Sequence, residues 1–69
     1  MDDAVAKVLE RIRMFRQEKG LSILELANRA ELSHSYVYYL ESKQKIPSLT
    51  TLYKLAVAMD INMRDFFGS

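Results

Sequence analysis

The sequence contains no cysteine and no tryptophan, and it has only two glycines and one proline among its 69 residues. Without cysteine, a disulfide framework and a thiolate zinc site are both excluded, and the composition fits a reducing, cytoplasmic setting. So few glycines and prolines argue against a loop-rich or all-β fold. No apolar run approaches the length of a membrane span, and Asp2 and Asp3 near the N-terminus are unlike a basic signal peptide.

Neither sign of charge dominates, because 10 lysines and arginines balance 9 acidic residues and leave a net charge of +1. This total is low for a nucleic-acid-binding chain, but the basic residues are unevenly placed. Two groups stand out, one in the first predicted helix and one beside the only proline: Lys7, Arg11, Arg13, Arg16 and Lys19, then Lys43 and Lys45. Both groups suit contacts with phosphates, and ordinary solvated helix side chains would give the same pattern.

Apolar residues recur with the period of an α-helix, and capping residues divide the chain into five predicted helices. The first covers residues 5–19 and ends at Gly20; Ser22 then begins the second, with Glu25 completing a capping box. Ser33 caps a third helix that runs to about Ser42, Ser48 caps the fourth, and Asn62 caps a short fifth. We therefore expect a single, compact, all-α domain over residues 1–69.

The segment from residue 22 to 42 is the most informative. Its two short helices are joined by Ala30-Glu31-Leu32, a link too tight for antiparallel packing and suited to a crossing of roughly 90–120°. Ala27 lets the two helices approach closely, and Leu32 and Val37 fill the angle between them. This pattern is typical of a helix-turn-helix.

Elements at consistent spacing along almost the whole chain support this assignment: Ile12-Arg13, Arg16, Gly20-Leu21-Ser22, Glu25-Leu26-Ala27, Ser33, Val37, Leu40-Glu41, Pro47-Ser48-Leu49, Leu52, Lys54-Leu55-Ala56 and Phe66-Phe67. In these positions the chain resembles the Xre/Cro/C1 family of helix-turn-helix regulators. The resemblance implies a five-helix, lambda-repressor-like domain whose third helix enters the major groove of double-stranded DNA. It also implies a bacterial or phage transcriptional regulator, a repressor rather than an activator, that acts as a homodimer.

By this resemblance the recognition helix covers residues 33–42, and His34, Ser35 and Tyr39 contact bases. Tyr38 also lies outside the core stripe of this helix, and we expect it to contact bases as well. A solvent-exposed helix start would also explain His34, and a phosphate would satisfy Ser35 equally well. Tyr38 and Tyr39 cannot both face the core if Val37 and Leu40 do, so two exposed rings indicate a partner surface, either DNA or protein. We expect phosphate contacts from the helix starts, the end of the third helix and the following loop: Ser22, Ser33, Ser42, Lys43, Lys45 and Ser48.

In the family, residues matching Arg16 and Glu41 form a partly buried ion pair that holds the recognition helix to the first helix. Bidentate arginine–carboxylate pairs suit such a site. The competing interpretation is that Arg16 contacts a DNA phosphate, and the two are compatible if the guanidinium is shared. The chain departs from the family at Ile23, where glutamine is frequent, and at Leu24, normally polar. Glu31 stands at a turn position usually held by glycine, so either the turn is reshaped or the backbone strain is tolerated.

A dimer is expected to form through the C-terminal end, where apolar residues exceed what one small core absorbs: Met59, Ile61, Met63, Phe66 and Phe67. The alternative is that the two phenylalanines belong to the core. An enzyme, a cofactor, a metal and a small-molecule ligand are not expected, because the chain has one histidine, no glycine-rich phosphate loop and no metal-ligand spacing. Two rival functions remain open: a protein-interaction module of antitoxin type that uses Ile23, Leu24 and the tyrosines, or the DNA-binding end of a longer regulator.

Overall fold

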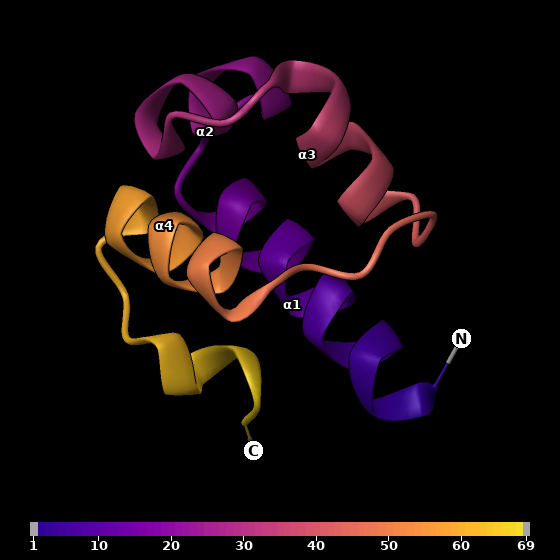
Figure 1. Ribbon diagram of the computed structural model, residues 1–69. Helices are drawn as coiled ribbons and strands as arrows, with labels where there is room; N and C mark the ends of the chain where they lie inside the picture. Colours follow the sequence, from indigo (N-terminus) through magenta and orange to yellow (C-terminus); the bar gives the residue numbers. More distant parts are fainter. Residues whose placement is uncertain (1, 69) are drawn as a thin grey trace.

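The computed structural model describes residues 2–68, which form four α-helices, one 3-10 helix and no β-strand. The helices are α1 (Asp3–Glu18), α2 (Ile23–Ala30), α3 (His34–Glu41) and α4 (Leu49–Met59), followed by η1 (Met63–Phe66). In Figure 1, α2 and α3 lie together at one end of the molecule, and α1 passes beneath them. The final segment returns past α4 toward the N-terminal half of α1.

Local capping explains where the helices begin. The Ser22 hydroxyl accepts from the Glu25 N–H at 3.0 Å, and the Glu25 carboxylate accepts from the Ser22 N–H at 2.9 Å, so the predicted capping box is present. The hydroxyls of Ser33 and Ser48 accept from the N–H groups of Tyr36 and Thr51 and cap α3 and α4 as predicted, without the reciprocal bond of a capping box. The cap of α1 was not predicted: the Asp2 carboxylate accepts from the Ala4 N–H and starts the helix at Asp3.

The core lies where the four helices meet. Its largest fully buried side chains come from every helix and from η1: Leu9, Ile12, Leu26, Val37, Leu40, Leu55, Met59 and Phe66. Phe66 packs edge-to-face on Phe15 of α1, with ring centroids 6.1 Å apart. This contact fastens the C-terminal segment to the first helix.

The fifth predicted helix is a single 3-10 turn, so that prediction needs correction. The Asp65 N–H donates to the Asn62 carbonyl and the Phe67 N–H donates to the Arg64 carbonyl, both three residues back. Four residues are too few for successive α-helical hydrogen bonds, each of which joins an N–H to the carbonyl four residues earlier. Short terminal segments commonly form a 3-10 helix instead. Among residues 2–68, none of the helices combines the length and apolar character needed to cross a membrane.

Candidate nucleic-acid interface

The turn between α2 and α3 fixes the orientation of α3. Glu31 takes a left-handed conformation with φ 57° and ψ 42°, so the turn keeps the shape that usually requires glycine and the strain is tolerated. The Leu32 N–H donates to the Ala27 carbonyl at 2.9 Å, which closes the end of α2. Ala27 and Val37 are completely buried between the helices, as expected for a close crossing.

An ion pair holds α3 against α1. The Arg16 guanidinium donates from Nε to Glu41 Oε2 at 2.7 Å and from Nη2 to Glu41 Oε1 at 2.9 Å. A third bond runs from Arg16 Nη1 to the Leu21 carbonyl at 2.8 Å, which adds the α1–α2 loop to the same junction. The side chains are only 12% and 6% exposed. The planar fork of arginine thus fixes the end of α3 at two points and the loop at a third.

A polar contact that the sequence did not reveal joins the inner side of α3 to α4. Tyr36 is half-buried, and its hydroxyl lies 3.1 Å from Oγ1 of the buried Thr51. The Ser48 hydroxyl donates to the same Thr51 atom at 3.0 Å. The inward position of Tyr36 follows from helical periodicity. No sequence pattern, however, predicts that its partner is Thr51, 15 residues away.

The opposite side of α3 faces solvent. His34, Ser35, Tyr38 and Tyr39 are all exposed, and the two tyrosines keep 51% and 38% of their surface accessible. Their rings pack edge-to-face with centroids 5.7 Å apart. The structure therefore brings the four predicted base-contacting residues onto one exposed helix surface.

The serines predicted to contact phosphates fall into two groups. The Ser42 hydroxyl donates to the Tyr38 carbonyl at 2.8 Å and the Ser48 hydroxyl donates to Thr51, so both hydroxyl protons are engaged. Ser22 and Ser33 are exposed, and among residues 2–68 their hydroxyls act only as acceptors of helix-capping bonds. The hydroxyls of Ser22 and Ser33 can therefore still donate a hydrogen bond to an anion, whereas those of Ser42 and Ser48 already donate within the domain.

The two lysines of the loop after α3 also differ. Lys43 has a left-handed backbone with φ 62°, and its ammonium lies 2.6 Å from the Glu10 carboxylate of α1. The hydrogen bond from Lys43, followed by its charge, lowers the pKa of Glu10 below the usual value. Lys45 is exposed. Part of the charge of Lys43 is thus already balanced within the domain.

A shallow hollow of about 210 Å³ lies beside the exposed surface of α3. Three elements contribute to it: Arg13 and Arg16 from α1, Ile23 from α2, and Tyr38 and Glu41 from α3, with Ser42 after it. The hollow thus brings Arg13 and the Arg16–Glu41 pair next to Tyr38. Arg13 is exposed, and the sequence alone had placed it only within a general basic group.

The residues predicted to form a dimer surface are divided between the core and the surface. Met59 and Phe66 are 2% and 0% exposed, so their assignment to the interface was wrong; packing against α1 and the rest of the core covers them. Ile61 is half-buried against the core, and Met63 lines a surface hollow with Leu49 and Tyr53. Phe67 is 60% exposed and lies at a different hollow.

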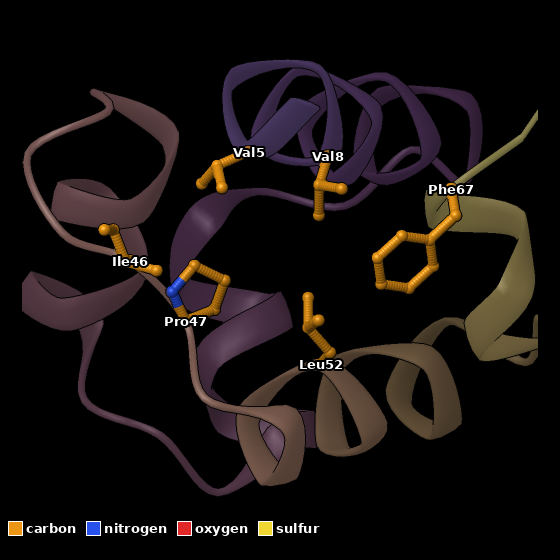
Figure 2. Close-up of a pocket in the computed structure, with 6 residues that line it drawn as sticks. All are labelled: Val5, Val8, Ile46, Pro47, Leu52 and Phe67. Carbon is orange, nitrogen blue, oxygen red and sulfur yellow. The ribbon is translucent and has the colours of Figure 1, made fainter. Parts of the chain in front are cut away.

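Figure 2 shows the hollow at Phe67, which is apolar and has a volume of about 90 Å³. The ring of Phe67 points toward Val8 of α1 and Leu52 of α4, and Ile46 and Pro47 of the α3–α4 loop lie at the other side. The two neighbouring phenylalanines therefore have separate roles, because Phe66 closes the core and Phe67 borders a surface depression.

Comparisons with known proteins agree with this geometry. A family model described as helix-turn-helix matches residues 12–66. The transcriptional regulator DdrOP3 of Deinococcus deserti is 41% identical over 59 residues, which are 86% of this chain and 46% of that protein. The immunity repressor protein of Bacillus phage phi105 is 37% identical over 59 residues, again 86% of this chain and 41% of the repressor. The chain thus spans about half the length of the curated relatives it matches.

A solved structure extends the likeness to three dimensions. The restriction-modification controller protein C.AhdI from Aeromonas hydrophila superposes with a TM-score of 0.87 at 41% identity. The match covers 91% of this chain and 96% of C.AhdI. Family model, relatives and structure agree on the same segment and the same fold, so the chain belongs to the helix-turn-helix family of Xre/Cro/C1 type.

Proposed function

We propose that this chain binds double-stranded DNA sequence-specifically through α3 and regulates transcription, as a repressor rather than an activator. One observation carries the proposal: the Arg16–Glu41 pair and the core fix α3 on its inner side, while His34, Ser35, Tyr38 and Tyr39 are exposed on the other. A helix held in this way fits the major groove with side chains directed at base edges. The names of DdrOP3 and the phage immunity repressor support the same function.

Phosphate contacts are assigned to the groups around α3. Ser22 and the amides at the start of α2 offer an anion site, because the end of a helix carries unpaired N–H groups and a positive dipole. Lys45 and the exposed guanidinium group of Arg13 add positive charge. Replacing Lys45 by alanine should weaken binding to every sequence alike and reduce the salt slope by about 1.

Selection of bound duplexes from a random pool tests the function directly. We expect one sequence class to be enriched, and its affinity should fall steeply as the salt concentration rises. A pool without enrichment, together with salt-insensitive capture of a protein partner, would contradict DNA binding and favour the interaction-module alternative. Salt separates the two because released counterions drive DNA binding, whereas apolar contacts between proteins depend little on salt.

We further propose that two copies bind a pseudo-palindromic site, since one small module buries little surface for strong specificity. The outer side of α4 supports a dimer: Leu49, Tyr53 and Val57 are exposed at four-residue spacing, and Met63 joins Leu49 and Tyr53 around a hollow of about 400 Å³. Exposed apolar rows of this kind mark association surfaces.

Sedimentation of the free protein and of its complex with a single operator tests the dimer. We expect two copies per duplex, with recognition helices about 34 Å apart. A Tyr53→Glu variant should bind as a monomer with lower affinity. The matched control Met14→Glu, the same change of charge at an exposed apolar residue of α1, should leave the assembly intact. One protein per specific duplex at saturation would overturn the dimer.

A further inference from the structure

The exposed surface of α3 lacks the side chains that usually read bases by paired hydrogen bonds. The helix sequence HSYVYYLE contains no arginine, lysine, asparagine or glutamine. Arginine and lysine read guanine, and asparagine and glutamine read adenine, through two bonds at once. What α3 offers instead is one imidazole, one serine hydroxyl and two tyrosine rings. Apolar contacts must therefore carry a larger share of any sequence preference.

The two exposed rings form a defined apolar surface. Tyr38 and Tyr39 pack edge-to-face, and each ring restricts the rotation of the other. Ile23, at the position where the family often has glutamine, lines the same hollow as Tyr38. The apolar surface thus continues from α3 onto the start of α2, and we call these three residues, Ile23, Tyr38 and Tyr39, the tyrosine surface.

Charge indicates which partner meets the tyrosine surface. The exposed Arg13 lines the hollow that also contains Ile23 and Tyr38, so positive charge lies beside the apolar residues, while Arg16 in the same hollow is paired with Glu41. An anionic strand running past the Arg13 guanidinium would bring the edges of its bases against the rings. This juxtaposition fits a nucleic acid better than an apolar protein partner.

Within the major groove, the apolar group that bases present is the methyl at C5 of thymine, and 5-methylcytosine carries the same group at the same place. Building on the proposed function, we infer that C5-methyl groups of pyrimidines, packed against Tyr38 and Tyr39, determine the sequence preference of this chain. Ile23 supports the Tyr38 side of that contact. Removing one such methyl from water corresponds to about fourfold in affinity.

Replacement of thymine by uracil tests the inference, because uracil keeps the pairing and the O4 acceptor and lacks only the methyl. In the best duplex from the random pool, each thymine is replaced singly. We expect a loss of about fourfold at one or more positions inside the protected site and no loss outside it. At each sensitive position, cytosine and 5-methylcytosine are then compared: a gain on methylation extends the recognition to 5-methylcytosine, and no gain restricts it to thymine.

Protein variants connect the methyl effect to the tyrosine surface. In Tyr38→Ala and Tyr39→Ala, thymine and uracil duplexes should bind equally at the position each ring covers, while the melting temperature changes little because both rings are exposed. Lys45→Ala is the matched control: it should weaken both duplexes equally and keep their ratio. A ratio that persists in the Tyr38→Ala/Tyr39→Ala double variant would overturn the inference.

The selection and the uracil replacements also distinguish a failure of methyl recognition from a failure of DNA binding itself. If no duplex is enriched, the proposed function and the inference fail together. If a duplex is enriched and all its thymines tolerate uracil without loss, DNA binding stands and the inference alone is overturned.

Discussion

Two ion pairs connect α1 with the chain around the end of α3, one at the last residue of the helix and one in the loop that follows, and their lengths are nearly equal. Arg16 lies 2.7 Å from Glu41, and Lys43 lies 2.6 Å from Glu10. Their surroundings differ strongly: the first pair is 12% and 6% exposed, and the second is 43% and 59% exposed. Arg16 also makes two bonds to Glu41 and one to the Leu21 carbonyl, whereas Lys43 makes one bond to Glu10.

Distance alone therefore does not rank the contributions of these two pairs to stability. Water screens the exposed Glu10–Lys43 pair, and holding two long side chains together costs entropy, so such pairs contribute little. The shielded pair behaves differently when broken, because its remaining member is left as an uncompensated buried charge. We therefore expect Arg16–Glu41 to fix the position of α3 and Glu10–Lys43 only to restrain the loop that follows it.

The largest effect is expected from breaking the shielded pair. Glu41→Ala should lower the free energy of unfolding by about 3–5 kcal/mol, because the Arg16 guanidinium stays buried without its carboxylate. A domain of this size has a total stability of only about 3–10 kcal/mol. Urea denaturation measures the loss. If Glu41→Ala destabilises the domain no more than Glu10→Ala does, the shielded pair is no more important for stability than the exposed one.

Replacing both members of the shielded pair should be less harmful than removing one. In Arg16→Met/Glu41→Leu no buried charge remains, and apolar residues of similar volume commonly match a buried pair in stability. The Leu21 carbonyl would still lose its partner, at a cost of about 1–3 kcal/mol. Denaturation of the single and double variants gives the coupling, and a double variant as unstable as Glu41→Ala would show that the charge is not the cause.

A third, smaller effect concerns the turn that orients α3 toward its exposed side. Glu31→Gly should raise the stability by about 1 kcal/mol, since glycine takes a left-handed backbone without the penalty of a Cβ atom. Asp60, at the end of α4, has the same conformation with φ 56°. Asp60→Gly should help less, because aspartate tolerates this region better than glutamate does. Thermal melting compares the two, and a destabilised Glu31→Gly would point to a contact of the glutamate side chain.

The smallest effect is expected at the exposed pair and depends on pH. Because Lys43 lowers the pKa of Glu10 in the folded chain, the pair contributes above the pKa of the unfolded carboxyl and loses this contribution as the pH falls through the folded value. The difference in stability between the natural chain and Glu10→Gln should therefore shrink toward zero in acid. It should also shrink at neutral pH in high salt. A difference that grows on acidification would contradict this assignment.

Features that depend on interactions between residues close together in the sequence were predicted well. Ser22 and Glu25, only three positions apart, exchange the bonds of a capping box, and Ser33 and Ser48 start their helices by the same chemistry. The left-handed conformation at Glu31 was one of two outcomes left open, and the exposure of Tyr38 and Tyr39 followed from the positions of Val37 and Leu40 on the helix.

Contacts between distant parts of the chain were predicted only where the family resemblance supplied them, as for Arg16 and Glu41. Nothing in the sequence joins Lys43 to Glu10, 33 positions away, or Tyr36 to Thr51. Nor does it distinguish Phe66, buried on Phe15, from its exposed neighbour Phe67.

The sequence by itself determined the helix starts, the period of the apolar residues and the helix-turn-helix family, because capping bonds and helical periodicity act within a few residues. The tertiary structure alone decided which lysine is paired, which phenylalanine is buried and which apolar side of α4 stays exposed. Those outcomes depend on how whole helices pack, and a side chain's partner across a helix interface is set by the crossing of the helices rather than by its neighbours in the chain.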